Sequence, residues 1–394
     1  MEDVYIVAAK RTAVGKAPRG VFAKTRPDDL LAHAIKAALQ TCPQLDHHAI
    51  DDAIIGCAMP EAEQGMNVAR NAVLFAGLPV SVAGVTINRF CSSGLQAIAF
   101  AANRIRAGEA DLMIAGGIES MSMVPMMGHK PALNIRIFQD DNIGIAYGMG
   151  LTAEKVAEQF KVSRQDQDEF ALQSHQKAIA AQERGDFAEE IAPYEVVLPE
   201  ADLQAQVIQN RRYMVEHDEG PRRDTTLEKL SRLKPVFAAH GTVTAGNSSQ
   251  MSDGAGALLL ASEKAVKLFD LEPLARFAGF SVAGVPPEIM GIGPKEAIPK
   301  VLKQTGLALA DIDWIELNEA FAAQSIAVIR ETGLDAAKVN PLGGAIALGH
   351  PLGATGAIRA ATIVHGLQKT KQRYGMVTMC IGVGMGAAGI FERV

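Results

Sequence analysis

The sequence predicts an α/β protein made of two similar halves. Between Val4 and Gly117, apolar runs typical of buried strands alternate with amphipathic segments in the order βαβαβαβ, a pattern characteristic of a sheet covered by helices. The pattern that begins at Val4 starts again at Leu274, so the chain contains an internal repeat. With 394 residues the chain is longer than a usual single domain and can bury two cores.

The elements of the first half follow from their apolar runs and their caps. Strands are expected at residues 4–9, 49–57 and 112–117 and in the β-branched run that ends at Cys91. Helices are expected from Pro27 to about Gln40, from Gln64 to Ala76, and after Cys91 up to a stop at Gly108.

Residues 120–244 have a different composition, and we interpret them as an insertion. Four methionines crowd into residues 121–127, which suits packing, a subunit interface or a surface for an acyl chain. Residues 152–184 are polar and helical, with a helix start at Ser163. Residues 211–234 carry seven basic side chains against five acidic ones, which fits either a solvated face or a docking place for a phosphorylated ligand.

The repeat becomes visible after the insertion. Further elements are expected as strands at 254–261, 274–279, 376–379 and 387–391 and after Ile312, and as helices at 297–304 and after Pro351. We therefore divide the chain into an N-terminal half (1–119 and 245–270), an inserted loop domain (120–244) and a C-terminal half (271–394).

Composition excludes several classes of protein. The formal net charge of −6 argues against a nucleic-acid-binding protein, because phosphate backbones require a basic face. The four cysteines are widely spaced and form no C-x-x-C pair, so we expect neither disulfides nor a bound metal, and we expect a reducing compartment. We find no leader and no apolar run of transmembrane length, which predicts a soluble, cytoplasmic protein.

Cys91 is the first candidate for a reactive residue. It lies between a β-branched run and a helix with apolar positions at Leu95, Ile98 and Ile105. The N-terminus of a helix stabilises an anion, so a thiol there is expected to ionise more readily than a free one. The alternative is a buried cysteine that only fills space.

His350 and Cys91 occupy corresponding turns of the two halves. Cys91 lies 41 residues after Ile50, and His350 lies 38 residues after the equivalent Ile312. If the halves pack about a pseudo-two-fold axis, the two turns can face each other. His350 stands among glycines just before a helix, where it is either a base or a structural hydrogen-bonding residue.

Two further polar residues end strands of the second half. Cys380 is followed by a G-x-G-x-G run, but a strand and not a helix comes next, so a dinucleotide site is rejected. The run instead offers backbone N–H groups for an oxyanion hole, among them that of Gly382. Asn318 can donate a hydrogen bond, or it can serve as a helix N-cap.

Together these residues resemble the thiolase family along essentially the whole chain. The blocks that carry the resemblance are NRFCSSGLQ (88–96), GTVTAGNSSQMSDGAGA (241–257), NEAFAAQ (318–324), GGAIALGHPLGATGA (343–357) and MCIGVGMGAAGIFE (379–392). The resemblance implies a five-layered αβαβα sandwich of two halves, with the loop domain over the active site. It also implies acyl transfer between 3-oxoacyl-CoA and coenzyme A, with coenzyme A as substrate and no other cofactor.

The resemblance also implies a role for each residue of the site. Cys91 accepts the acyl group, His350 activates it, and Cys380 is the acid and base at the acetyl carbon. His350 and Asn318, the latter through a water, form one oxyanion hole, and the N–H groups of Cys91 and Gly382 form the other. The expected contacts with coenzyme A or the substrate are Arg222, Ser249, Met149 and Phe321.

Several alternatives remain open within this resemblance. We expect a degradative 3-ketoacyl-CoA thiolase of fatty-acid β-oxidation, because Gly148 stands where the short-chain biosynthetic branch carries a histidine before Met-Gly. The alternative is a biosynthetic acetoacetyl-CoA thiolase. A ketoacyl synthase would lack Cys380, and a non-catalytic acyl-CoA-binding protein would be expected to have lost one of the reactive residues. A homodimer or homotetramer is implied, and assembly into a β-oxidation complex stays open.

Overall fold

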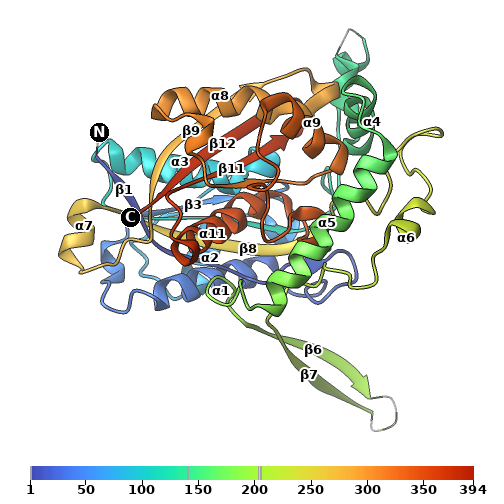
Figure 1. Cartoon of the computed structure of the whole chain (residues 1–394). Helices are drawn as coiled ribbons and strands as arrows, with labels where there is room; N and C mark the ends of the chain where they lie inside the picture. Colours follow the sequence, from blue (N-terminus) through green and yellow to red (C-terminus); the bar gives the residue numbers. More distant parts are fainter. Residues whose placement is uncertain (1, 140–141, 203, 205) are drawn as a thin grey trace.

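The computed structural model describes residues 2–139, 142–202, 204 and 206–394 and is built around one large sheet (Figure 1). Its strands in spatial order are β10 (Trp314–Leu317), β11 (Tyr374–Ile381), β12 (Met385–Arg393), β9 (Ala275–Gly284), β1 (Val4–Arg11), β8 (Ser252–Ser262), β5 (Leu112–Ser120), β3 (Asp52–Gly56) and β4 (Val85–Ile87). The short strand β2 (Gly15–Lys16) pairs with β8.

The order of these strands confirms the internal repeat. From the middle outwards, β1, β8, β5 and β3 are joined by antiparallel, antiparallel and parallel pairing. On the other side β9, β12, β11 and β10 follow with the same three pairings. The two sets meet through β1 and β9, which pair only at Tyr5 with Arg276 and at Ile6 with Ala275. Each half therefore contributes its own set of strands to the large sheet.

Helices complete five layers, as the family resemblance implied. The helices α3 (Ser93–Arg106) and α11 (Leu352–Thr370) lie between the two sets of strands and contact both. On one outer face, α1 (Pro27–Gln40) and α2 (Val68–Phe75) cover the N-terminal strands. On the other, α8 (Gly293–Thr305) covers β9 and β12.

The two central helices touch through their backbones. A Cβ atom built on Gly94 of α3 would lie 2.7 Å from the amide nitrogen of Ala357 in α11. A Cβ atom on Gly356 of α11 would lie 2.2 Å from the amide nitrogen of Leu95. Both distances are shorter than real carbon contacts, so only glycine fits at this crossing. Because both contacts lie near the starts of the helices, the preceding turns, which hold Cys91 and His350, are brought together.

The segment that we interpreted as an insertion holds helices and a hairpin. Its elements are α4 (Met149–Gln159), α5 (Arg164–Glu183), α6 (Leu227–Ser231), β6 (Tyr194–Asp202), β7 (Val207–Val215) and the 3₁₀ turns η4 (Ile135–Phe138) and η5 (Ile143–Ala146). The predicted start at Ser163 is confirmed by a capping box, in which Ser163 and Asp166 exchange side-chain to backbone hydrogen bonds. The hairpin β6–β7 projects away from the layers (Figure 1).

Several predicted boundaries differ from the structure, two of them for clear local reasons. The strand expected from residue 49 begins at Asp52, because Asp46 caps a 3₁₀ turn, η1 (His47–Ala49). The helix expected from Gln64 begins at Val68, because Met66 and Asn67 have positive φ values of 49° and 56°.

The remaining elements are α7 (Glu263–Leu268), α9 (Ala322–Thr332), α10 (Ala345–Leu348), η2 (Ala62–Gln64), η3 (Phe90–Ser92), η6 (Pro287–Ile292) and η7 (Leu309–Asp311).

Among the described residues, none of the helices combines the length and the apolar character that a membrane crossing requires. The four cysteines are all buried and unpaired.

Candidate active site

Cys91 lies in η3, directly before α3, as predicted. The turn is fixed by Ser93, whose hydroxyl accepts a hydrogen bond from the Arg89 N–H at 2.8 Å and donates one to the Phe90 carbonyl at 2.7 Å. Burial raises the pKa of the Cys91 thiol to about 11. The N–H groups of Gly382 and of Cys91 itself oppose this rise, and the Glu119 carboxylate adds to it.

The expectation that the helix start makes Cys91 more acidic is therefore wrong in its net result. The backbone N–H groups do favour the thiolate, but the loss of water around a buried sulfur outweighs them. Cys91 is a neutral thiol at neutral pH and needs a base to become a nucleophile.

His350 is buried in the turn directly before α11, and its hydrogen bonds indicate which ring nitrogen carries the proton. Its Nδ1 lies 2.7 Å from the Thr355 hydroxyl, which itself donates to the Pro351 carbonyl at 3.1 Å. The Thr355 oxygen therefore accepts from Nδ1–H, and we infer from this network that Nε2 carries the lone pair. Burial, and after it the charge of Arg359, lowers the pKa of His350 to about 3, so the ring is neutral.

Asn318 is the residue that His350 faces. Its Nδ2 lies 3.3 Å from His350 Nε2, so it donates to the lone pair of the ring. The backbone of Asn318 is held by a 2.9 Å hydrogen bond from its N–H to the carbonyl of Thr378 in β11. The N-cap of α9 is Phe321, so the alternative role of Asn318 as a helix cap is wrong. Its Oδ1 is buried and has no hydrogen-bond partner among the described residues.

Cys380 lies near the end of β11 and completes the group. Burial raises the pKa of its thiol, and interaction with Cys91 raises it further, so the two sulfurs are close enough to influence each other. Cys380 packs in one apolar cluster with Met149 and Phe321. It is a neutral thiol at neutral pH and can donate a proton.

A cavity of about 570 Å³ opens beside Cys91. Cys91 and Gly382 line it, and so do Gly148 and Met149 from the start of α4. Most other lining residues are apolar, namely Ala58, Met59, Pro60, Phe90, Met126, Met127, Pro131, Ala132, Leu133, Ile145, Ala146, Leu352 and Val383. The predicted methionine cluster thus contributes to the wall, and Met121 of the same cluster packs against Cys91.

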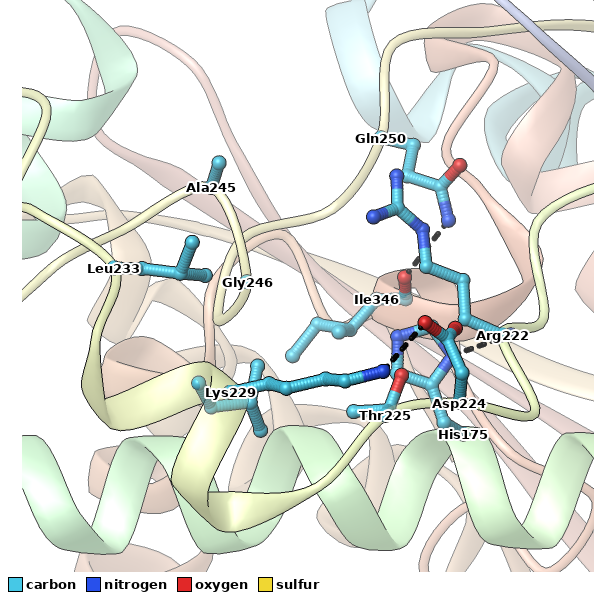
Figure 2. Close-up of a pocket in the computed structure, with 11 residues that line it drawn as sticks. His175, Arg222, Asp224, Thr225, Lys229, Leu233, Ala245, Gly246, Gln250 and Ile346 are labelled. Atoms are coloured by element: carbon cyan, nitrogen blue, oxygen red, sulfur yellow. Dashed lines mark hydrogen bonds and ion pairs between the residues drawn. The ribbon is translucent and has the colours of Figure 1, made fainter.

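Arg222 lies in a second cavity, of about 200 Å³ (Figure 2). Its backbone N–H donates to Nδ1 of His175 on α5 at 3.2 Å. Gly246 and Gln250 line the same cavity, whereas Ser249 is not among its lining residues. The Ser249 N–H instead donates to the Ala320 carbonyl, so Ser249 lies beside the segment that contains Phe321.

Most of the other basic residues at positions 211–234 form ion pairs. These ion pairs are Arg211–Glu200, Arg212–Glu195, Arg223–Glu183, Lys229–Asp224 and Arg232–Glu228. Their side chains are largely exposed, so for these residues the solvated-face interpretation holds. Arg222 has no such ion pair within the described part of the chain and stays available in its cavity.

Sequence reasoning missed Thr355, which orients His350, and Glu119, a buried carboxylate that influences Cys91. The available signal was a carboxylate near the end of an otherwise apolar run in the strand Leu112–Ser120. Within the described ranges, no three His, Cys, Asp or Glu side chains gather in a way that could hold a metal ion.

The fold and the site define an α/β acyltransferase. The family description "Thiolase, N-terminal domain" matches residues 4–264, and "Thiolase, C-terminal domain" matches residues 271–393. The chain therefore belongs to the thiolase family, as the sequence blocks indicated.

Individual relatives match over the full length. A "3-ketoacyl-CoA thiolase" of Bacillus subtilis is 52% identical over 392 residues, covering 100% of both chains. A "Beta-ketoadipyl-CoA thiolase" of Pseudomonas aeruginosa is 48% identical, covering 100% of this chain and 99% of the relative. Among solved structures, human mitochondrial 3-ketoacyl-CoA thiolase superposes with a TM-score of 0.90 at 40% identity, covering 100% of this chain and 99% of that one.

Proposed function

We propose that the protein is a degradative 3-ketoacyl-CoA thiolase that converts 3-oxoacyl-CoA and coenzyme A to acyl-CoA and acetyl-CoA. The observation that carries the proposal is the apolar cavity of about 570 Å³ beside Cys91. A cavity of this size is within the range of about 300–1,000 Å³ that small-molecule sites occupy, and its apolar wall suits an acyl tail.

In the first step Cys91 attacks the ketone carbon of the substrate. His350 Nε2, which carries a lone pair, takes the thiol proton. We assign the oxyanion that forms on the ketone oxygen to the N–H groups of Cys91 and Gly382, which interact with the attacking sulfur. Because the pKa of the Cys91 thiol is raised and that of His350 is lowered, the proposal requires the proton to move as the carbon–sulfur bond forms and not before it.

The bond between the α and β carbons then breaks, and the electron pair leaves on acetyl-CoA as an enolate. We assign the enolate oxygen to the other oxyanion hole, in which His350 Nε2–H donates directly and Asn318 acts through a water. The Cys380 thiol gives its proton to the enolate carbon and becomes a thiolate. Coenzyme A next attacks the acyl-Cys91 thioester, and its thiol proton returns to the Cys380 thiolate. The bond between the acyl carbon and Cys91 breaks, Cys91 takes back the proton held on His350 Nε2, and acyl-CoA leaves.

Coenzyme A binding is assigned to Arg222 and Ser249, with Met149 and Phe321 at the acyl end. Arg222 without an ion pair suits a phosphate group, since a guanidinium forms strong charge-assisted hydrogen bonds with phosphate. The proposed steps move protons and an acyl group without changing oxidation state, so they require no metal and no redox cofactor. Residues 120–244 form the inserted domain in this proposal, with 1–119 and 245–270 as the N-terminal half and 271–394 as the C-terminal half.

The biosynthetic acetoacetyl-CoA thiolase remains the alternative, and a binding protein without activity is the third. The name of the Pseudomonas relative suggests a further candidate substrate, β-ketoadipyl-CoA, whose acyl tail ends in a carboxylate. The cavity wall is mainly apolar, with Glu61 and Lys130 as its two charged residues, which favours an uncharged tail. We further expect a cytoplasmic homodimer or homotetramer, free or within a β-oxidation complex.

Steady-state rates on a series of substrates test the proposal. The substrates are the coenzyme A thioesters of 3-oxobutanoate, 3-oxooctanoate, 3-oxododecanoate and 3-oxoadipate. We expect kcat/KM to rise from the four-carbon to the eight-carbon substrate and to be lowest on 3-oxoadipyl-CoA. Activity confined to the four-carbon substrate would assign the biosynthetic branch, and a preference for 3-oxoadipyl-CoA would assign the dicarboxylic one. No turnover with any of them would leave only the binding protein.

A further inference from the structure

Glu119 of β5 is a fully buried carboxylate that joins three separate segments of the chain. It is 0% exposed, and each of its oxygens accepts several hydrogen bonds. The donors are Ala58 N at 2.8 Å, Met59 N at 3.2 Å, Gln64 Nε2 at 2.8 Å and Gly353 N at 2.8 Å.

These contacts identify the form of Glu119 that the fold requires. Backbone N–H groups can only donate, and the Gln64 amide is fixed because its Oε1 accepts from the Ser120 N–H. Burial raises the pKa of Glu119 above its ordinary value, and the donated hydrogen bonds offset only part of this rise. With donors on both oxygens, the carboxylate is the form that satisfies every partner. The only titratable side chain that hydrogen-bonds to it in the described structure is the Cys57 thiol, at 3.8 Å.

The segments that Glu119 joins are parts of the site. Ala58 and Met59 belong to the N-terminal half and line the cavity beside Cys91. Gly353 belongs to the first turn of α11, the same turn in which Thr355 holds the His350 ring. One side chain therefore ties the cavity wall of one half to the helix start that carries the base from the other half.

We propose that Glu119 is a positioning residue for acyl transfer. It fixes the position of the His350 turn relative to Cys91, and its negative charge acts on the Cys91 thiol. The inference rests on the proposed function. The charge opposes premature formation of the Cys91 thiolate, so the proton stays on sulfur until His350 takes it. Burying a carboxylate costs free energy, because it loses its hydration. These two roles, fixing the His350 turn and keeping Cys91 protonated, explain why a carboxylate is present here.

Glu119→Gln tests the proposal with almost no change in volume. Whichever way the new amide points, its NH₂ group meets two donors, either Ala58 and Gly353 or Met59 and Gln64. We expect kcat to fall about 10- to 100-fold, as for a small misplacement of reacting groups, with little change in the KM for coenzyme A. Removal of the charge should also speed alkylation of Cys91 by iodoacetamide about two- to tenfold at a fixed pH below the thiol's pKa.

Glu190→Gln is the matched control. Glu190 is also buried, at 1% exposure, and its partners Arg11 and Thr362 take no part in the proposed mechanism. Its loss is expected to lower the melting temperature without changing kcat or the alkylation profile. A fall in stability alone therefore cannot imitate the expected result for Glu119.

Glu119→Asp keeps the negative charge on a side chain that is one methylene shorter. We expect it to lower kcat and to leave the pH profile of Cys91 alkylation near that of the wild type. This variant replaces Glu119→Gln in the test if Glu119→Gln does not fold. A Glu119→Gln enzyme with kcat and alkylation both within about twofold of the wild type would overturn the proposal, since an unpaired buried group should cost more. If the wild type turns over no 3-oxoacyl-CoA, the proposed function fails, and alkylation still reports on Glu119.

Discussion

Gly148→His tests directly whether the cavity beside Cys91 holds an acyl tail. Gly148 is the N-cap of α4, with φ −61° and ψ 148°, an extended conformation that any residue adopts. No atom lies within 4 Å of a Cβ built at this position, so a side chain can enter without strain. Because Gly148 lines the cavity, the imidazole takes up space that a long tail would use.

The expected magnitude follows from the apolar surface at stake. Each buried methylene contributes up to about 0.8 kcal/mol, which is roughly fourfold in kcat/KM. Four additional methylenes, from the four-carbon to the eight-carbon substrate, can therefore contribute up to roughly 3 kcal/mol, or about 200-fold, in the wild type. An imidazole that excludes two methylenes should remove about 1.6 kcal/mol of this, or roughly 15-fold.

The assay is kcat/KM for 3-oxobutanoyl-CoA and 3-oxooctanoyl-CoA in wild type, Gly148→His and Gly148→Ala. We expect Gly148→His to lose activity on the longer substrate and to keep it on the shorter, while Gly148→Ala stays near the wild type. An equal loss on both substrates would show that the histidine disturbs the reacting groups and not the tail. No loss on either would refute the assignment of the cavity to the tail.

Three further predictions concern the reacting groups and the stability of the fold. After incubation with acyl-CoA and an acid quench, mass spectrometry should locate the acyl group on Cys91, and acylation of Cys380 instead would reverse the assignment. Cys380→Ala should lose about 10²- to 10⁴-fold in turnover but still become acylated, whereas Cys91→Ala should lose both, and near wild-type turnover of Cys380→Ala would refute its acid–base role. Burial lowers the pKa of His350 from its ordinary 6.5 to about 3, so the unfolded chain binds this proton more readily than the folded one. The resulting contribution to stability is complete above pH 6.5 and is lost as the pH falls towards 3. His350→Asn should therefore show a weaker fall of the unfolding free energy than the wild type between about pH 7 and about pH 5 in urea denaturation, and equal falls would contradict the buried neutral ring.

The sequence was informative where local pattern and repetition decide the structure. The equivalent spacing of Cys91 and His350 within the two halves predicted that their turns correspond, and the turns do precede α3 and α11. The repeat was detectable because each half must bury its own apolar strands, so the same pattern of strands and helices returns.

The chemical state of the site depended on contacts between distant residues. The pKa of Cys91 was predicted in the wrong direction, because a helix start is a local feature whereas burial by Met121 and Leu352 is not. Glu119 was missed because its partners Ala58 and Gly353 lie 61 and 234 positions away in the chain. A carboxylate near the end of an otherwise apolar run indicates that partners exist, but only the fold identifies them.

The glycine contact between α3 and α11 determines how closely the turns that hold Cys91 and His350 can approach each other. In the proposed mechanism neither half suffices alone, since the thiol of Cys91 comes from one and the imidazole of His350 from the other. The close approach of α3 and α11 at Gly94 and Gly356 is therefore what would bring these two groups together. A methyl group added at either position would collide with the facing backbone and force the two helices apart. If Cys91 and His350 act together as proposed, such a variant would lose turnover although neither residue had been changed.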